Sequence, residues 1–198
     1  MSAVELGRTL FEHRRWVHPA FVLAALALGG SRPSGLVVGG ALLLVLLAIR
    51  VWAVRYMGGA ARVHARKAQE SRVLLTVGPF AWVRNPLYLG NALGLAGACL
   101  LFGPPWFAAL ALVASLLWYR AIIGWEEQVL EGLYGQEYRD YLARVPRLLP
   151  RPPARVGAAP GLELYSWGKV IRRERGAVIS VAVLLALSLL LEILVPFR

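Results

Sequence analysis

Two short polar stretches carry the residue types that could do chemistry in an otherwise apolar chain. The first, "VRNPLYLGN", places Arg84, Asn85 and Tyr88 at the mouth of an apolar segment. The second, "WEEQVLEGLYGQEYRDY", contains the adjacent acids Glu126 and Glu127. An arginine can grip a ligand carboxylate, carboxylates accept hydrogen bonds, and tyrosine faces stabilise a cation. These groups form one site only if the fold brings the two stretches together.

Each stretch also has a purely structural interpretation. Asn85 and Pro86 are favoured at the N-cap and the first position of a helix. Arg84 suits a cytoplasmic membrane interface, and Tyr88 suits the aromatic belt found there. Acids favour the positive N-terminal end of a helix, which accounts for one acid of the adjacent pair better than for two. Taken alone, the stretches leave both interpretations open.

The composition indicates an integral membrane protein. The 198 residues are 58% hydrophobic with a mean hydropathy of +0.58, and the excess lies in four or five long apolar stretches. The single cysteine, Cys99, lies in one of these stretches, which excludes an intrachain disulfide and a cysteine-rich metal site. The N-terminus has no short apolar core followed by a small-residue cleavage site, so we expect the first apolar segment to be a retained helix.

We therefore expect an all-α, polytopic transmembrane bundle that forms a single integral membrane domain over residues 1–198. The expected spans, about five in number, are Trp16–Gly30, Gly35–Tyr56, Pro86–Phe102, Pro105–Gly124 and Gly176–Pro196. This divides the chain into the first two spans (15–56), a core with a helical hairpin and a cytoplasmic helical cap (57–150), a basic interfacial linker (151–175) and the last span (176–198).

The basic residues predict the orientation of these spans. Three lie in the N-terminal arm, six in residues 55–84 and ten in residues 120–175, so 19 of the 22 fall on one side of the membrane. The other side receives only Arg32 and Arg198, while Arg50 lies within a span. The positive-inside rule then places the N-terminus in the cytoplasm. The net charge of +11 is explained by topology and attraction to anionic lipid, and we expect no nucleic-acid binding.

The "GPP" sequence between the third and fourth spans predicts a tight helical hairpin. Because the chain enters the membrane at Pro86 and leaves it at Gly124, the two polar stretches fall on the same cytoplasmic face. Within the third span, Gly90 and Gly94 form a G-x-x-x-G pattern that admits a closely packed neighbouring helix. Asn91 requires a polar partner inside the membrane.

The second stretch reads as two successive helical segments. Val129, Leu130, Leu133 and Tyr134 share one face at helical spacing, and Gly135 is expected to end that helix. The next turns carry Tyr138 and Tyr141 on one side.

These motifs together resemble one known group of enzymes. "GPFAWVRNPLYLGN", followed about 35 residues later by "EEQVLEGLYGQEYRDYLARVPRLLP", is similar to the isoprenylcysteine carboxyl methyltransferase and phospholipid methyltransferase superfamily of membrane proteins. That pattern has a Gly-Pro-aromatic element, Arg-His-Pro-x-Tyr, a helical hairpin, a Glu-Glu pair, aromatic-Gly-x-x-Tyr-x-x-Tyr and a proline-closed basic segment. The match covers roughly residues 50–150, which makes the core a methyltransferase-like unit. It departs from the pattern at Asn85, which stands where the family has histidine and cannot exchange a proton at neutral pH.

The resemblance implies a methyl transfer from S-adenosylmethionine, bound in a pocket open to the cytoplasm, to a lipid-like or small apolar acceptor from the bilayer. The acceptor stays open among an isoprenoid carboxylate, a phospholipid amine and a thiol. The implied catalytic residues are Arg84, Asn85 and Glu127, with Arg139 or Arg144 as alternative partners of the cofactor carboxylate. The implied cofactor-binding residues are Gly78, Pro79, Arg84, Asn85, Pro86, Tyr88, Leu89, Asn91, Glu126, Glu127, Tyr134, Tyr138 and Tyr141.

The lipid bilayer is the expected partner, and we expect neither a bound metal nor an obligate protein partner. Twenty arginines against two lysines suggest a GC-rich bacterium and hence its inner (plasma) membrane. Two other functions remain open: an NADPH-dependent membrane reductase of the sterol-reductase type, and a non-catalytic membrane scaffold that has lost activity through Asn85. A channel or transporter is least favoured, because the only charges well inside the expected spans are Arg50 and Glu192 and no inverted repeat is visible.

Overall fold

The computed structural model describes residues 3–30, 33–58, 74–153 and 162–194. Over these residues the chain forms seven helices and no strand, which confirms the expected all-α class. The helices are α1 (Ala3–Leu28), α2 (Pro33–Tyr56), α4 (Pro79–Trp82), α5 (Pro86–Phe102), α6 (Pro105–Tyr134), α7 (Gln136–Arg144) and α8 (Trp167–Leu194).

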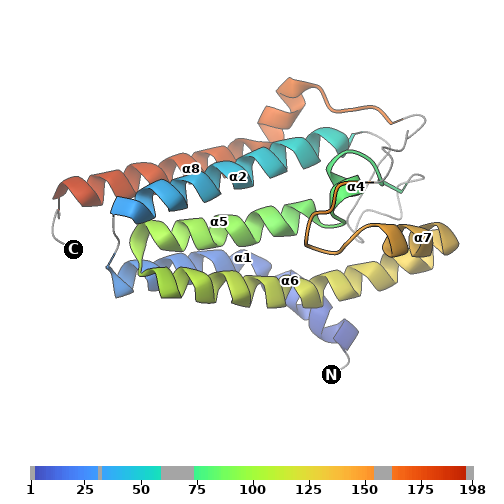
Figure 1. Cartoon of the computed structure of the whole chain (residues 1–198), viewed down its shortest axis with the longest axis horizontal. Helices are drawn as coiled ribbons and strands as arrows, with labels where there is room; N and C mark the ends of the chain where they lie inside the picture. The colour runs from blue at the N-terminus through green and yellow to red at the C-terminus, as the bar shows by residue number, and fades with distance from the viewer. Residues whose placement is uncertain (1–2, 31–32, 59–73, 154–161, 195–198) are drawn as a thin grey trace.

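The five long helices run up and down alongside one another (Figure 1). Helices α1, α5 and α8 begin at the end of the bundle where α4 and α7 lie, whereas α2 and α6 run back towards it. The described part of the N-terminus therefore lies at the same end as α4 and α7, and α8 ends at the opposite end. Both polar stretches of the sequence therefore lie at the same end of the molecule.

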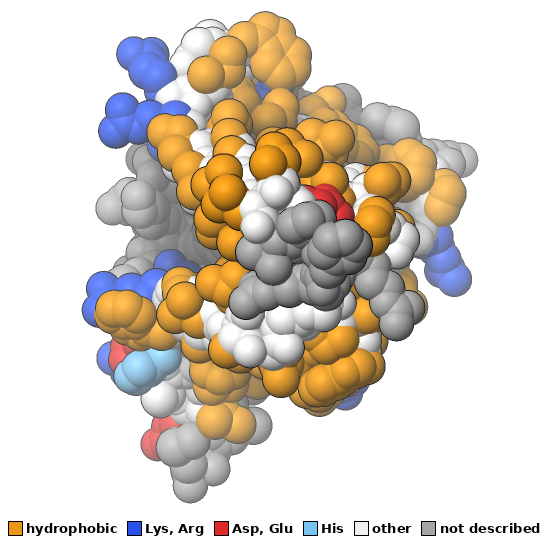
Figure 2. Space-filling view, turned by 90° about the vertical axis from the view of Figure 1, so that its left-hand side faces the viewer, with side chains coloured by type: hydrophobic (Ala, Val, Ile, Leu, Met, Phe, Trp, Pro, Cys, Tyr) orange, Lys and Arg blue, Asp and Glu red, His pale blue; other side chains and the backbone are white. Residues whose placement is uncertain are grey.

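Within the described residues, three helices, α2, α6 and α8, are long and apolar enough to cross a membrane. Helix α5 is equally apolar but has 17 residues. Large apolar side chains on α8, such as Ile171 and Ile193, are exposed as expected for contact with lipid. Figure 2 looks onto the end opposite α4 and α7, where hydrophobic side chains cover most of the described surface and Lys and Arg lie at its periphery. Seven of the basic residues used to orient the spans lie outside the described residues: Arg32, Arg62, Arg66, Lys67, Arg72, Arg155 and Arg198.

Three helices extend beyond the spans expected from the sequence. Helix α1 begins at Ala3, well before Trp16, and α8 begins at Trp167, nine residues before Gly176. Helix α6 does not end at Gly124, the expected end of its span, but continues to Tyr134. A single glycine inside a helix costs only about 1 kcal/mol relative to alanine, which the burial of neighbouring apolar residues such as Leu130 offsets. The basic linker expected over 151–175 is thus helical from Trp167 onwards.

Helices α2 and α5 pack backbone to backbone. A Cβ atom at Gly97 would lie 2.7 Å from the carbonyl oxygen of Gly39, and one at Gly94 would lie 2.5 Å from the Leu46 side chain. Small residues therefore permit this approach, as the G-x-x-x-G pattern predicts. Cys99 is buried in the adjoining core as a free thiol.

Gly135 separates α6 from α7, as expected from the sequence. Its φ of 56° lies in the left-handed region, which glycine adopts without strain. The turn directs Tyr138 and Tyr141 inward, where they pack with Leu74 and Val145 in a small apolar cluster. This packing fixes α7 as a cap over the end of the bundle.

Candidate functional site

The carboxylate of Glu127 joins the two polar stretches. Arg84 Nη1 lies 2.9 Å from Glu127 Oε1, and Arg147 Nε donates a hydrogen bond to the same oxygen at 3.1 Å. Arg147 Nη2 also pairs with the second carboxylate oxygen of Glu127. The Arg84 and Glu127 side chains are about nine-tenths buried, whereas that of Arg147 is 38% exposed. An arginine before α5, an acid in α6 and an arginine after α7 therefore form one cluster.

Backbone contacts hold the segment before α5 against the segment after α7. The amide of Arg84 donates to the carbonyl of Pro146 at 2.9 Å. The Asn85 side chain donates through Nδ2 to the carbonyl of Arg147 at 3.1 Å. Asn85 occupies the N-cap position of α5, with Pro86 at the first helical position, but its side chain makes no capping bond. Asn85 therefore acts as a hydrogen-bonding clamp between the two segments.

Helix α4 packs against α2 and is joined to α7 by a hydrogen bond. Gly78 precedes it with a φ of 61°, and a Cβ atom there would lie 2.5 Å from the Tyr56 ring, so only glycine fits. Pro79 begins the helix and is fully buried. The hydroxyl of Tyr141 donates to the carbonyl of Phe80 at 2.7 Å. The Gly-Pro-aromatic motif and the tyrosine motif are thus joined directly.

Two aromatic rings extend the site towards the interior of the bundle. Tyr88 of α5 stacks on Tyr119 of α6, with ring centroids 4.7 Å apart and an angle of 25° between the planes. Glu126, which is 3% exposed, lies close enough to the Tyr88 hydroxyl to interact with it. The Tyr119 hydroxyl lies 2.8 Å from His18 Nε2. A buried acid and a stacked pair of tyrosines therefore border the arginine–glutamate cluster.

Among the described residues, two donor atoms at this end are buried without a hydrogen-bond partner, namely Arg84 Nε and the Tyr134 hydroxyl. Buried polar groups normally find partners, so such orphaned donors mark places that a ligand can complete. The nearby phenols stay neutral, because burial raises the pKa of both Tyr138 and Tyr141 above its usual range. Both tyrosines are therefore hydrogen-bond donors, not anions, at neutral pH.

Asn91 faces a second polar cluster further along α5. Its side-chain oxygen accepts a hydrogen bond from Arg50 Nη1 at 3.0 Å, which supplies the partner that the sequence requires. Arg50 also pairs with Glu174 of α8, with contacts of 2.6 and 3.2 Å. Among the predicted site residues, Asn91 therefore does not join the cluster around Glu127. Leu89, which is partly buried, lies between the two clusters in the chain.

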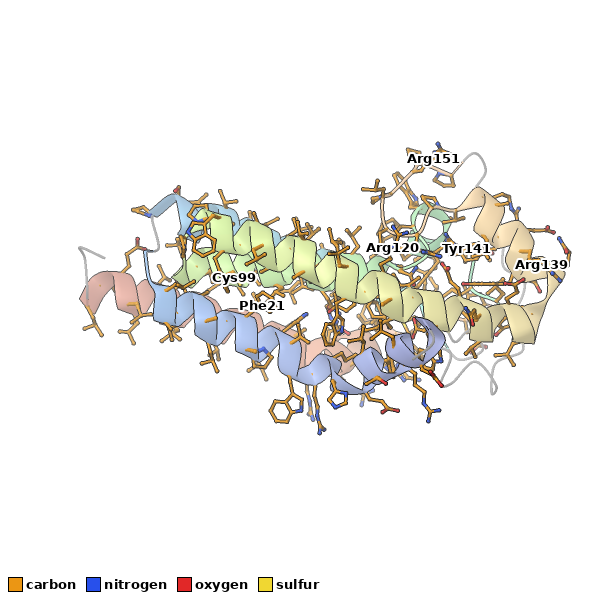
Figure 3. The ribbon with its side chains drawn as sticks, turned by 90° about the horizontal axis from the view of Figure 1, so that it is seen from below. Phe21, Cys99, Arg120, Arg139, Tyr141 and Arg151 are labelled. Atoms are coloured by element: carbon orange, nitrogen blue, oxygen red, sulfur yellow. The ribbon has the colours of Figure 1, made fainter. Side chains whose placement is uncertain are left out.

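Arg147 is not among the site residues that the sequence predicts. The two arginines predicted as alternative partners of the cofactor carboxylate are exposed on α7 and bind other residues: Arg139 pairs with Glu131 of α6 at 3.6 Å, and Arg144 Nε donates to the Asp140 carbonyl. Figure 3 shows Arg139 at the outer end of α7, away from Tyr141. In the sequence, the position of Arg147 is indicated only by the "VPR" at the end of α7, where a proline turns the chain back towards the bundle. Over the described residues, no group of three or more His, Cys, Asp and Glu side chains could hold a metal ion.

Comparison with known proteins identifies related sequences. A family model described as phospholipid methyltransferase matches residues 34–137. The cobalt-zinc-cadmium resistance protein CzcN of Cupriavidus metallidurans is 32% identical over 138 residues, which covers 66% of this chain and 59% of that protein. The nickel-cobalt-cadmium resistance protein NccN of Alcaligenes xylosoxydans xylosoxydans is 33% identical over 66% of this chain and 60% of its own length. The chain thus spans about three fifths of the length of these two relatives.

A third relative carries an enzyme name. The protein-S-isoprenylcysteine O-methyltransferase of Schizosaccharomyces pombe is 31% identical over 93 residues, which covers 46% of this chain and 39% of that protein. No solved structure matches the chain significantly. The resemblance predicted from the two motifs is therefore confirmed.

Proposed function

Because the chain belongs to the phospholipid methyltransferase family, we propose that it transfers a methyl group from S-adenosylmethionine to a lipid-like or small apolar acceptor at the membrane. The observation that carries the proposal is the cluster in which Glu127 binds both Arg84 and Arg147. It unites the two halves of the family pattern, and orphaned buried donors lie at the same end of the bundle.

The residues of this cluster fit the chemistry of the cofactor, which supplies the methyl group on a sulfonium. Arg147 is exposed enough to grip the cofactor carboxylate in a charge-assisted pair. The Arg84 Nε and the Tyr134 hydroxyl donate to its ribose or base. The acids Glu126 and Glu127 offer negative charge to the sulfonium and the amino group, and the Tyr88 ring offers its face. The carboxylate, the ribose or base, the sulfonium and the amino group of the cofactor thus each have a complementary partner in the protein.

Alignment is the main task of these side chains. Methyl transfer is an in-line displacement, so the protein mainly orients the reactants and excludes water. Arg84 and Glu127 fix each other, and Asn85 holds the segment of Arg147 in place without exchanging a proton. The motif residues form the backbone at the edge of the proposed site: Gly78, Pro79, Pro86 and Leu89. Tyr138 and Tyr141 hold α7 in place over this end of the bundle.

The proposed topology has five spans, with α1 and α5 added to the three long apolar helices. Because the helices alternate in direction, the described basic residues of the N-terminal arm and of residues 120–175 lie towards the end that holds α4 and α7. The positive-inside rule makes this the cytoplasmic face and makes α7 a cytoplasmic cap. We assign the protein to a bacterial inner membrane with the site facing the cytoplasm.

The family description favours methyl transfer over the two other functions considered from the sequence, an NADPH-dependent reductase and a non-catalytic scaffold. Titration calorimetry of the purified full chain with S-adenosylmethionine, S-adenosylhomocysteine and NADPH, run in parallel, separates the three. Binding of the first two alone supports the methyltransferase. Binding of NADPH alone supports the reductase, and binding of none supports the scaffold.

A further inference from the structure

A second site lies deeper in the bundle than the arginine–glutamate cluster. A cavity of about 560 Å³ opens between α1, α2, α5 and α8. Most of its lining is aliphatic, including Val22, Leu43, Leu95 and Leu184. Its polar lining consists of His18, Arg50, Asn91 and Ser180. The volume and the few polar groups are those of a site for a small amphipathic molecule.

The polar groups of this cavity carry no uncompensated charge. Arg50 is bound by both carboxylate oxygens of Glu174, whose side chain is 4% exposed, and by the side chain of Asn91. His18 is bound by the Tyr119 hydroxyl. An anionic or cationic head group entering here would therefore be a buried charge without a counter-ion, which is strongly unfavourable. An uncharged hydroxyl or thiol instead finds hydrogen-bonding groups at the imidazole and the amide.

The cavity adjoins the proposed cofactor site through α5. Asn85 clamps the cofactor site and Asn91 lines the cavity, six residues or about 9 Å further along the helix. Between them, Tyr88 stacks on Tyr119, whose hydroxyl contacts His18 at the cavity wall. A molecule in the cavity thus has its polar end towards the cofactor site and its apolar part among aliphatic side chains.

Two walls of the cavity come from outside the segment that matches the family model. Helix α1 supplies residues such as His18 and Val22, and α8 supplies residues such as Ala177 and Val181. Arg50, within the matched segment, is bound by Glu174, which lies outside it. Two of the four helices that line the cavity therefore lie outside the match to the family model.

From these contacts we propose that the cavity binds the methyl acceptor, and that the acceptor is a hydrocarbon or isoprenoid chain ending in an uncharged hydroxyl or thiol. The inference rests on the proposed methyltransferase function. It excludes the isoprenoid carboxylate and the phospholipid amine, because both carry a charge at neutral pH and Arg50 is already paired. His18 and Asn91 hold the head group, and the aliphatic lining holds the tail. Methyl transfer would break the bond between the methyl group and the sulfonium, form an oxygen–methyl or sulfur–methyl bond and release S-adenosylhomocysteine, while the proton of the hydroxyl or thiol would pass to the His18 imidazole.

Photolabelling tests this assignment directly. The probe is a twelve-carbon alcohol with a diazirine at its far end, applied to the full chain in detergent and mapped by peptide mass spectrometry. We expect labelled peptides from the four helices that line the cavity, α1, α2, α5 and α8, and we expect 1-dodecanethiol to compete at about tenfold lower concentration than dodecanoate or dodecylamine. Labelling of other helices, or equal competition by all three compounds, would overturn the assignment, because the second result reflects partitioning of the tail alone.

Two variants sharpen the test. Ala177→Trp fills the cavity from α8 and should reduce labelling at least about fivefold, whereas Ala182→Trp, on the exposed side of the same helix, should not. Glu174→Gln leaves Arg50 without its counter-ion and should reverse the preference in favour of dodecanoate. An Ala177→Trp protein that is labelled like the wild type overturns the proposal, as does an unchanged preference in a folded Glu174→Gln protein.

Binding of S-adenosylmethionine, measured on the same preparations, separates this inference from the function on which it rests. Cofactor binding without labelling of the cavity overturns the acceptor site alone. Labelling of the cavity without cofactor binding overturns the methyltransferase and with it the role of the cavity as an acceptor site.

Discussion

Arg84 and Glu127 form an ion pair of 2.9 Å in which both side chains are about nine-tenths buried. A buried charge without its partner is far more costly than the pair itself, so removal of either side chain leaves an unfavourable buried charge on the other. The pair fixes the start of α5 against the C-terminal part of α6. Arg147, which is more exposed and binds the same carboxylate, is the member of the cluster best placed to leave its partner for a ligand.

Loss of the Glu127 charge should destabilise the protein as well as the site. Glu127→Gln removes the counter-ion of two arginines, and we expect a loss of about 3 kcal/mol in stability together with loss of S-adenosylmethionine binding. Thermal unfolding in detergent and titration calorimetry measure the two effects. The control is Glu131→Gln, which removes an exposed pair of 3.6 Å with Arg139 and should change stability by no more than about 0.5 kcal/mol. Equal effects of the two variants would rule out the role given to Glu127.

Arg147 should contribute to ligand affinity more than to folding. Arg147→Ala leaves the Arg84–Glu127 pair intact, and we expect the affinity for S-adenosylmethionine to fall at least about tenfold, or ~1.4 kcal/mol, with a modest change in thermal stability. Arg144→Ala, an exposed change on α7, is the matched control and should bind normally. Normal binding by Arg147→Ala would remove Arg147 from the cofactor site.

The parts of this site that the sequence predicts are those with local causes. An Asn-Pro pair begins α5, a glycine ends α6, and small residues at helical spacing mark the contact of α5 with α2. The parts it does not predict depend on contacts between distant segments. Arg147 reaches Glu127 because Pro146 lies against Arg84, and no spacing in the chain encodes that distance.

The sequence also does not predict that Glu174 is the partner of Arg50, for a related reason. The sequence places Glu174 in the predicted basic linker, because Gly176 is the predicted start of the last span. The helix runs through that glycine, and its first turns bring Glu174 against Arg50. Helix ends depend on tertiary packing, which a window of sequence does not contain.

Asn85 should be replaceable by a residue that keeps its hydrogen bond. Its Nδ2 group donates to the Arg147 carbonyl, and a histidine ring nitrogen can donate in the same way. We expect Asn85→His to retain S-adenosylmethionine binding, and Asn85→Leu to lose about 1–2 kcal/mol in stability because a carbonyl loses its donor. Thermal unfolding and calorimetry on both variants measure this. If histidine impairs binding as much as leucine, Asn85 does more than clamp the backbone.

The Tyr141 hydroxyl should make stability depend on alkaline pH. It donates to the Phe80 carbonyl, and burial raises its pKa above the usual value of about 10. Above pH ~10 the unfolded chain gives up this proton while the folded chain retains it, so stability is full below that pH and falls as the pH rises. We expect Tyr141→Phe to be less stable than the wild type by about 1–2 kcal/mol at pH 7, because the Phe80 carbonyl loses its donor. Between pH 9 and pH 11, about one unit either side of the pKa of a free phenol, the variant should then lose less stability than the wild type. Thermal unfolding across that range gives the comparison. Tyr138 titrates in the same direction in both proteins, so the difference between them reports on the Tyr141 hydroxyl and its coupling to Tyr138, and parallel curves would show that this hydroxyl is not coupled to folding.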